Sequence, residues 1–162
     1  MRIQTQKIKI LDYGAGNIAS VMFALNRLGV RAELTSDPAE LAMADKLIFP
    51  GVGHAGAAMQ ILKESGLDRV LIDFSRPLLG ICLGMQLMFR LSEEGNTRAL
   101  GLFPDTVRRF PAGEKVPHMG WNQIFDVKGS LFHGIEEGSH FYFVHSYYVP
   151  PGSYTQAMCC HG

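Results

Sequence analysis

Residues 77–86 read Pro-Leu-Leu-Gly-Ile-Cys-Leu-Gly-Met-Gln, and this stretch decides the fold predicted for the rest of the chain. The apolar run Leu78–Ile81 predicts a buried strand. Apolar side chains at helical spacing after Cys82 predict a helix that continues to Leu91. Glycines at positions 80 and 84 would relieve crowding in a tight turn between the two elements. The stretch therefore predicts a strand, a sharp turn that carries Cys82, and a helix.

The position of Cys82 in this turn suits a reactive thiol. At a helix N-terminus the thiolate is favoured by the helix dipole and by unpaired backbone N–H groups, which makes the sulfur a better nucleophile. The N–H of Leu83 could then face an oxyanion. The pattern Gly-x-Cys-x-Gly fits an inert core thiol equally well, because cysteine is among the most buried residue types.

Strands alternate with helices before this turn, and short strands follow it. Strands are predicted at Ile8–Leu11, Ala32–Thr35 and Lys46–Phe49, with helical patterns between and after them. This alternation predicts an α/β fold with a doubly wound, mostly parallel sheet flanked by helices and a site at the carboxyl ends of its strands. The pattern after Leu100 predicts a β-richer C-terminal half, with strands at Val107–Phe110, Trp121–Val127 and Phe141–Val149.

The composition predicts one globular domain over residues 1–162, because 47% of the residues are hydrophobic and 19% are charged. Fifteen basic and fifteen acidic side chains cancel, which disfavours nucleic acid or an anionic membrane as a partner and favours a small ligand. Three cysteines, two of them adjacent, suit a reducing cytoplasm. No signal-length apolar stretch follows Met1–Lys9, and no run approaches the roughly 20 residues of a membrane span.

Two glycine-rich loops follow predicted strands. The Gly-x-Gly at Gly14 and Gly16 lacks the third glycine of a dinucleotide fingerprint, so nucleotide binding is disfavoured. In the second loop, Gly51 and Gly53 flank Val52 and let the peptide planes turn, so that a backbone N–H could point into a cavity beside the strand ends.

The string Gly80-Ile-Cys-Leu-Gly-Met-Gln86 resembles the nucleophile elbow of class I, triad-type glutamine amidotransferases, which release ammonia from glutamine through a cysteine thioester. The resemblance implies that Cys82 is the nucleophile, that the amides of Val52 and Leu83 hold the oxyanion, and that glutamine is bound by Gly51, Gly53, Gln86 and Glu94. Read without the resemblance, Glu94 is also consistent with a solvated loop charge just beyond the predicted helix.

Two further segments narrow the resemblance to the glutaminase subunits of imidazole glycerol phosphate synthases. In that family, the segment around Trp121 faces the cyclase partner, and a His-Ser-Tyr string lies along the bound glutamine. The implied partner contacts are Pro117, His118, Met119, Trp121 and Asn122, and the implied glutamine contacts are His145, Ser146 and Tyr147. A lone tryptophan is more often a core residue, so a buried Trp121 is the alternative.

His145 is not assigned as the general base. In the family the base and its carboxylate partner belong to a later Gln-Phe-His-Pro-Glu string, which is absent from residues 1–162. The resemblance implies that the triad His and Glu lie beyond Gly162 and that the chain is a C-terminally truncated form.

The resemblance also implies an activity. Glutamine is hydrolysed to glutamate and ammonia, and the ammonia passes to a (β/α)₈ cyclase partner that makes imidazole glycerol phosphate in histidine biosynthesis. No cofactor or metal is expected. Two alternatives stay open at this point: another class I amidotransferase or a hydrolase on the same fold, and a catalytically dead chain that only binds partner or glutamine.

Overall fold

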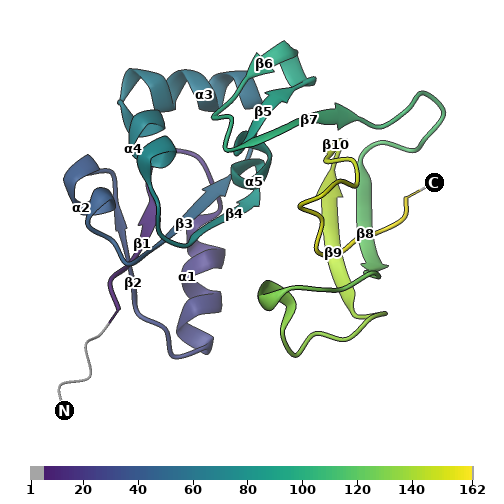
Figure 1. Cartoon of the computed structure of the whole chain (residues 1–162), viewed down its shortest axis with the longest axis horizontal. Helices are drawn as coiled ribbons and strands as arrows, with labels where there is room; N and C mark the ends of the chain where they lie inside the picture. Colours follow the sequence, from purple (N-terminus) through teal and green to yellow (C-terminus); the bar gives the residue numbers. More distant parts are fainter. Residues whose placement is uncertain (1–5, 162) are drawn as a thin grey trace. The chain divides into compact units, whose positions relative to one another are not determined.

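The computed structural model describes residues 6–161, and the chain divides into two compact units, Met1–Thr106 and Val107–Gly162 (Figure 1). The first five residues of the N-terminal segment and Gly162, the last residue of the predicted domain, lie outside the described residues. A single domain over residues 1–162 stays a prediction.

The first unit is built on a four-stranded parallel sheet with the order β2-β1-β3-β4. Its elements are β1 (Ile8–Leu11), α1 (Ile18–Arg27), β2 (Ala32–Thr35), α2 (Pro38–Ala42), β3 (Lys46–Gly51), α3 (Ala55–Glu64), α4 (Leu67–Asp73), β4 (Leu78–Cys82), α5 (Leu83–Leu87), β5 (Phe89–Ser92), η1 (Glu94–Asn96), β6 (Thr97–Arg98) and the start of β7 (Phe103–Arg109). The predicted doubly wound, mostly parallel sheet is confirmed.

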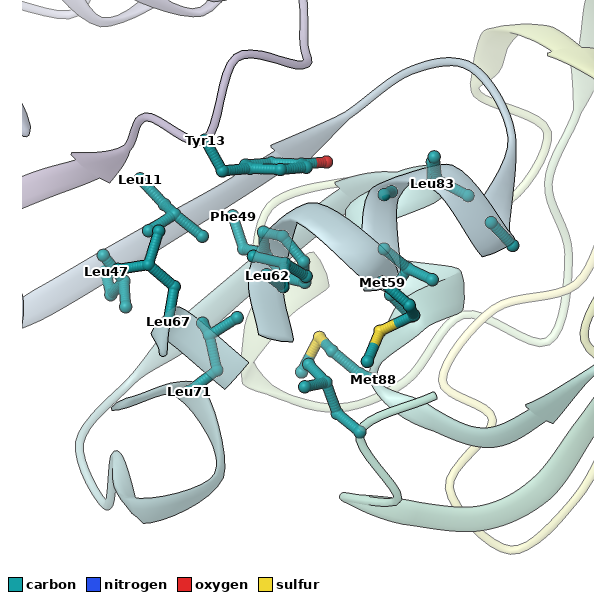
Figure 2. Close-up of a cluster of buried hydrophobic side chains, with 14 of the residues drawn as sticks. Leu11, Tyr13, Leu47, Phe49, Met59, Leu62, Leu67, Leu71, Leu83 and Met88 are labelled. Atoms are coloured by element: carbon teal, nitrogen blue, oxygen red, sulfur yellow. The ribbon is translucent and has the colours of Figure 1, made fainter. Parts of the chain in front are cut away.

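Helices cover both faces of this sheet, because successive residues of a buried strand point to opposite faces. Ile10, on one face of β1, packs with Ile48 and with the apolar side of α1. Leu11, on the other face, joins a larger core with side chains from β3, α3, α4 and α5, and Figure 2 shows this cluster around Phe49 and Leu62. Among the residues that the structure describes, no helix has the length and apolar character needed to cross a membrane.

Local signals set the boundaries of most elements in this unit. Asp37 caps α2 by accepting a hydrogen bond from the Ala39 N–H at 2.8 Å, and Pro38 is the first helical residue, as predicted. Gly29 follows α1 with a φ of +67°, the left-handed conformation typical of a residue just past a helix end.

The elbow stretch differs from the prediction in two places. The helix predicted to reach Leu91 ends at Leu87, because the next residues form β5 and pair with β6 in the register Leu91↔Arg98. Phe89 stacks on Phe103 with ring centroids 5.1 Å apart, so long-range packing overrides the local helical pattern. The strand predicted to be buried is an edge strand of the described sheet, and Ile81 is 37% exposed.

Among its described residues, the regular elements of the second unit are strands and one short 3₁₀ turn. It contains the end of β7, β8 (His118–Gln123), η2 (Ser130–Phe132), β9 (His140–His145) and β10 (Tyr147–Tyr148). Strands β8 and β9 pair antiparallel along their whole length, and β10 pairs antiparallel with Arg108 and Arg109 of β7. The β-richer C-terminal half is therefore confirmed.

The three predicted strands of this unit have other boundaries. The strand predicted over Val107–Phe110 is the end of β7, which begins at Phe103 and ends at Arg109. The strand predicted over Trp121–Val127 lies at His118–Gln123, and Asp126, with a φ of +52°, cannot continue an extended run. The strand predicted over Phe141–Val149 is divided at Ser146 into β9 and β10.

Candidate active site

Cys82 joins the last strand of the parallel sheet directly to a helix. It is the final residue of β4 and the N-cap of α5, and its side chain is exposed. Its φ of +54° and ψ of −118° lie outside the conformations that residues with a Cβ normally adopt. The local structure therefore holds the thiol at the tip of a strained turn, as the sequence predicts.

Two glycines allow this turn because neighbouring backbone occupies the space of their missing side chains. A Cβ on Gly80 would lie 2.5 Å from the Cα of Met85. A Cβ on Gly84 would lie 1.9 Å from the carbonyl oxygen of Phe49 in β3. The start of α5 therefore packs directly on β3, which fixes the position of Cys82.

The loop predicted to form the second half of an oxyanion hole lies against the elbow. Gly51 is the register partner of Cys82 in the β3–β4 ladder, and a Cβ on Gly51 would lie 2.5 Å from the backbone nitrogen of Gly84. Val52 follows with 49% exposure, and Gly53 has a φ of +92°. The segments that carry the amides of Val52 and Leu83 are thus in contact.

Tyr13 is a further residue of this site that the sequence analysis missed. Its side chain is buried, and its hydroxyl has no hydrogen-bond partner among the described residues. A Cβ on Gly51 would lie 2.9 Å from that hydroxyl oxygen, and in Figure 2 the hydroxyl points toward Leu83. Burial, and then the nearby charge of Cys82, raise the pKa of Tyr13 to about 12. Tyr13 is therefore a neutral donor beside the elbow at physiological pH.

The signal for Tyr13 was its place in the chain. It follows the predicted strand Ile8–Leu11 at the carboxyl edge of a parallel sheet, where sites of this fold class lie.

Gln86 and Glu94 occupy different environments in the first unit. Gln86 is buried on α5, one turn after Cys82. One carboxylate oxygen of Glu94 accepts a hydrogen bond from the Ala55 N–H at 2.7 Å, at the start of α3. His54 caps the same helix, because its Nδ1 accepts from the Gly56 N–H at 3.0 Å. The hydrogen bond of Glu94 therefore connects η1 to the end of the loop that contains Val52.

The predicted glutamine contacts of the second unit lie where β9 ends and β10 begins. His145, Ser146 and Tyr147 are all partly buried. The Nδ1 of His145 lies 2.8 Å from the Tyr147 carbonyl oxygen, and its Nε2 lies 3.1 Å from the Nδ1 of His118. Both ring nitrogens of His145 therefore have a partner within the second unit.

The predicted partner segment is mostly exposed. Pro117 is exposed, Met119 is 62% exposed and Trp121 is 71% exposed, so the core alternative for Trp121 is wrong. Trp121 contacts Tyr142 edge-on, with ring centroids 5.6 Å apart. Tyr142 and Val144 pair with Trp121 and Met119 across the ladder and are also exposed, but the sequence analysis did not name them.

Two members of that segment point inward instead. His118 is buried at 6% exposure, and Asn122 is half-buried with its amide on the Cys160 carbonyl oxygen. The reason is the alternation of a strand, which turns His118 and Asn122 to the face opposite Met119 and Trp121. Their side chains therefore face away from the exposed side of β8, and a contact of His118 or Asn122 with a partner stays a prediction.

Comparison with known proteins places the chain in a family. The class-I glutamine amidotransferase family model matches residues 9–160. The imidazole glycerol phosphate synthase subunit HisH of Bacteroides fragilis YCH46 is 55% identical over 154 residues, which cover 93% of this chain and 79% of the relative. The HisH subunits of Moorella thermoacetica and Haemophilus influenzae Rd are 53% and 48% identical, and the matches cover 89% and 96% of this chain and 71% and 79% of those relatives.

Solved structures agree with the fold. A crystal structure of a glutamine amidotransferase superposes with a TM-score of 0.70 at 20% sequence identity, covering 90% of this chain and 75% of that one. A putative GMP synthase component of Thermoplasma acidophilum gives a TM-score of 0.64 at 21% identity, covering 90% of this chain and 67% of that one. On the family model and the relatives near 50% identity, the chain belongs to the class-I glutamine amidotransferases, in the family of HisH subunits of imidazole glycerol phosphate synthase.

Proposed function

We propose that this chain is a glutaminase, which hydrolyses glutamine to glutamate and ammonia through a thioester on Cys82. The observation that carries the proposal is the exposed Cys82 in a strained turn, with Gly51 beside it in the ladder. A backbone outlier of this kind persists only where the surrounding structure holds it, and such outliers cluster at active sites. The relatives matched at 48–55% identity carry one name, so another class I amidotransferase is not favoured.

In the proposed reaction, the Sγ of Cys82 attacks the carboxamide carbon of glutamine. The amides of Val52 and Leu83 hold the resulting oxyanion. The C–N bond then breaks, and the nitrogen leaves as ammonia after taking a proton. Water attacks the thioester carbon, the C–S bond breaks, and glutamate leaves while the thiol regains its proton. Gln86, Glu94, Gly51 and Gly53 are proposed to hold the substrate.

The general base of this reaction is not assigned to His54 or His145. The Nδ1 of His54 already accepts the hydrogen bond that caps α3, and His145 has a partner at each ring nitrogen. We keep the family's His and Glu of the Gln-Phe-His-Pro-Glu string as the proposed base and its orienting carboxylate.

Ammonia release from glutamine in the presence of a cyclase partner tests the proposed nucleophile. Cys82→Ala should remove the activity, because no thioester can then form. Turnover that survives Cys82→Ala would overturn the proposed nucleophile.

The proposed partner is the cyclase of the synthase, a (β/α)₈ barrel, and its proposed docking surface is the exposed face of the β8–β9 ladder. Met119, Trp121, Tyr142 and Val144 form two adjacent cross-strand pairs there. Aromatic and methionine side chains are enriched at protein interfaces, and tryptophan and tyrosine often dominate their binding energy.

The proposed location is the cytoplasm, where the three free cysteines stay reduced.

A further inference from the structure

Residues 52–54, here called the connecting loop, join β3 to α3 within the first unit, and the residue at each end of the loop is fixed. At its start, Gly51 pairs with Cys82 in the β3–β4 ladder. At its end, Ala55 is completely buried as the first residue of α3. The connecting loop carries the Val52 amide of the proposed oxyanion hole, so the position of that amide depends on how both ends are held.

The end at Ala55 is held by a side chain from η1. One carboxylate oxygen of Glu94 accepts a hydrogen bond from the Ala55 N–H at 2.7 Å. An amide in the first turn of a helix has no acceptor within that helix, so this bond comes from outside α3. A hydrogen bond from an amide to a carboxylate is short and roughly twice as strong as one between neutral groups. Glu94 therefore fixes the direction of the Ala55 N–H.

The backbone of Glu94 is itself held on both sides. The Glu94 N–H donates to the hydroxyl of Ser92 at 3.2 Å, and the hydroxyl of Thr97 donates to the Glu94 carbonyl oxygen at 2.7 Å. Both partners are buried. The carboxylate thus reaches Ala55 from a backbone position that its neighbours define.

His54 provides a second link between the connecting loop and η1. Its Nδ1 accepts a hydrogen bond from the Gly56 N–H at 3.0 Å. Its ring lies against Gly95, where an added Cβ would be 2.8 Å from the ring Cε1. Glu94 and Gly95 of η1 therefore contact Ala55 and His54, so η1 and the end of the connecting loop form one packed junction.

We propose that Glu94 is a positioning residue, which holds the connecting loop so that the Val52 amide stays beside the turn at Cys82. This inference rests on the proposed function, because the oxyanion role of the Val52 amide comes from there. In this role Glu94 acts through the Ala55 peptide and not through the substrate. The glutamine contact proposed for Glu94 would use its other carboxylate oxygen.

The first test measures hydrogen exchange of single backbone amides by NMR. In the parent protein, the Ala55 amide should exchange at least about tenfold more slowly than an unstructured amide, as for one hydrogen bond. Glu94→Ala should remove this protection, whereas Glu94→Gln keeps an acceptor oxygen and should retain most of it. The Gly56 amide is the internal reference, because its acceptor is His54 and its protection should stay. An unprotected Ala55 amide in the parent would overturn the inference, whether or not the protein binds glutamine.

The second test separates positioning from substrate binding. Chlorolevulinate, which is a glutamine-like chloroketone without the α-amino group, offers Glu94 no ammonium to bind. Its carbonyl oxygen gains negative charge when the Cys82 sulfur attacks, so amides that hold an oxyanion assist the labelling. Iodoacetamide alkylates the same sulfur by displacement and forms no oxyanion. The ratio of the two labelling rates therefore reports the oxyanion amides and not the affinity for an amino group.

We expect the ratio of chlorolevulinate to iodoacetamide rates to fall about tenfold in Glu94→Ala and to stay near the parent value in Glu94→Gln. Glu64→Ala is the matched control, because it removes a carboxylate at the other end of α3 that bonds only the Gln60 side chain among the described contacts. An unchanged ratio in Glu94→Ala would overturn the inference, and so would a fall in Glu94→Gln as large as in Glu94→Ala.

Failure of the proposed function has a different result. Glutamine would then fail to protect Cys82 of the parent protein from the amino-bearing, glutamine-like chloroketone. The exchange of the Ala55 amide and the chlorolevulinate ratio need no bound glutamine, so they decide the role of Glu94 separately.

Discussion

At the residue scale, three glycines shape the site, because they have no side chain where neighbouring backbone packs closely. Gly80, Gly84 and Gly51 each leave a space that backbone atoms fill, and together they bring β3, β4 and α5 into direct contact. Cys82 lies between Gly80 and Gly84 and has a positive φ. The buried hydroxyl of Tyr13 is close enough for the charge of Cys82 to raise its pKa.

Gly84→Ala should destabilise the first unit strongly. The new Cβ would lie 1.9 Å from the Phe49 carbonyl oxygen, so β3 and α5 must separate. Overpacking costs about 1–3 kcal/mol, and a clash with backbone lies at or above the upper end of that range. Urea unfolding measures the loss. Gly56→Ala in α3 is the matched control, because its Cβ would meet side-chain atoms rather than backbone, namely the His54 ring at 3.2 Å and the Thr97 hydroxyl oxygen at 3.3 Å. Equal unfolding midpoints for the two variants would refute this explanation of the turn.

Tyr13→Phe should stabilise the folded chain while it alters the site. A buried hydroxyl without a partner costs about 1–3 kcal/mol, and phenylalanine removes the hydroxyl and keeps the packing of the ring against Phe49. We expect the free energy of unfolding at pH 7 to rise by about 1 kcal/mol. A fall of similar size would show that the hydroxyl has a bonding partner in the free protein and would contradict its role as an unused donor.

At the element scale, the sequence predicted the bounds of those helices and strands whose ends are set by neighbouring residues. Strand β1 has the predicted bounds because its apolar run is short and followed by glycines, and α2 begins at Pro38 because Asp37 caps it. The end of α5 was not predictable in this way, since β5 forms only by pairing with residues after Asn96. The same limit applies to Tyr142, whose place beside Trp121 depends on the β8–β9 register.

Within the candidate site, the sharp turn at Cys82 was predictable from the spacing of Gly80 and Gly84, whereas the role of Cys82 as the nucleophile rests on the family resemblance and stays a proposal. The inward direction of His118 was not, because it depends on where β8 begins, and the predicted strand started three residues too late. For Tyr13 the sequence offers only its position after β1, because the closeness of its hydroxyl to Gly51 depends on packing against another strand.

Stability of the second unit should fall in mild acid. Burial, with the charges of His161 and His145, lowers the pKa of His118 from its usual value of 6.5. The folded state therefore disfavours the protonated ring, so this contribution to stability is complete above pH 6.5 and is lost as the pH falls from 6.5 through the lowered pKa. Amide exchange of β8 and β9 between about pH 7.5 and 5 measures it. The decline should be smaller in His118→Phe, and an equal decline there would assign the effect to other groups.

At the scale of the whole molecule, exposed apolar side chains are clustered on the β8–β9 ladder and scattered elsewhere among the described residues. The exposed pairs of the β8–β9 ladder gather large apolar side chains on one strand face, whereas other exposed apolar side chains, such as Phe23 at 68% exposure, lie on separate elements. A gathered patch of this kind marks an interaction site more often than scattered apolar residues do.

Trp121→Ala should weaken association with the cyclase partner without unfolding the chain. Truncating an aromatic anchor typically costs about 2 kcal/mol or more of binding free energy, whereas an exposed side chain adds little to stability. Calorimetric titration against the cyclase gives the dissociation constant. Phe23→Ala in α1 is the matched control for a lost exposed aromatic ring. Unchanged affinity in Trp121→Ala would place the interface elsewhere.

The role of Cys82 as the nucleophile toward glutamine is tested by peptide mapping after brief treatment of the native chain with the glutamine-like chloroketone. Cys82 should carry the first adduct, and added glutamine should prevent it. Cys159 should react slowly, because burial and the neighbouring Cys160 raise its pKa and lower its thiolate fraction. A first adduct on Cys159 or Cys160, with Cys82 unmodified, would contradict the assignment of the nucleophile.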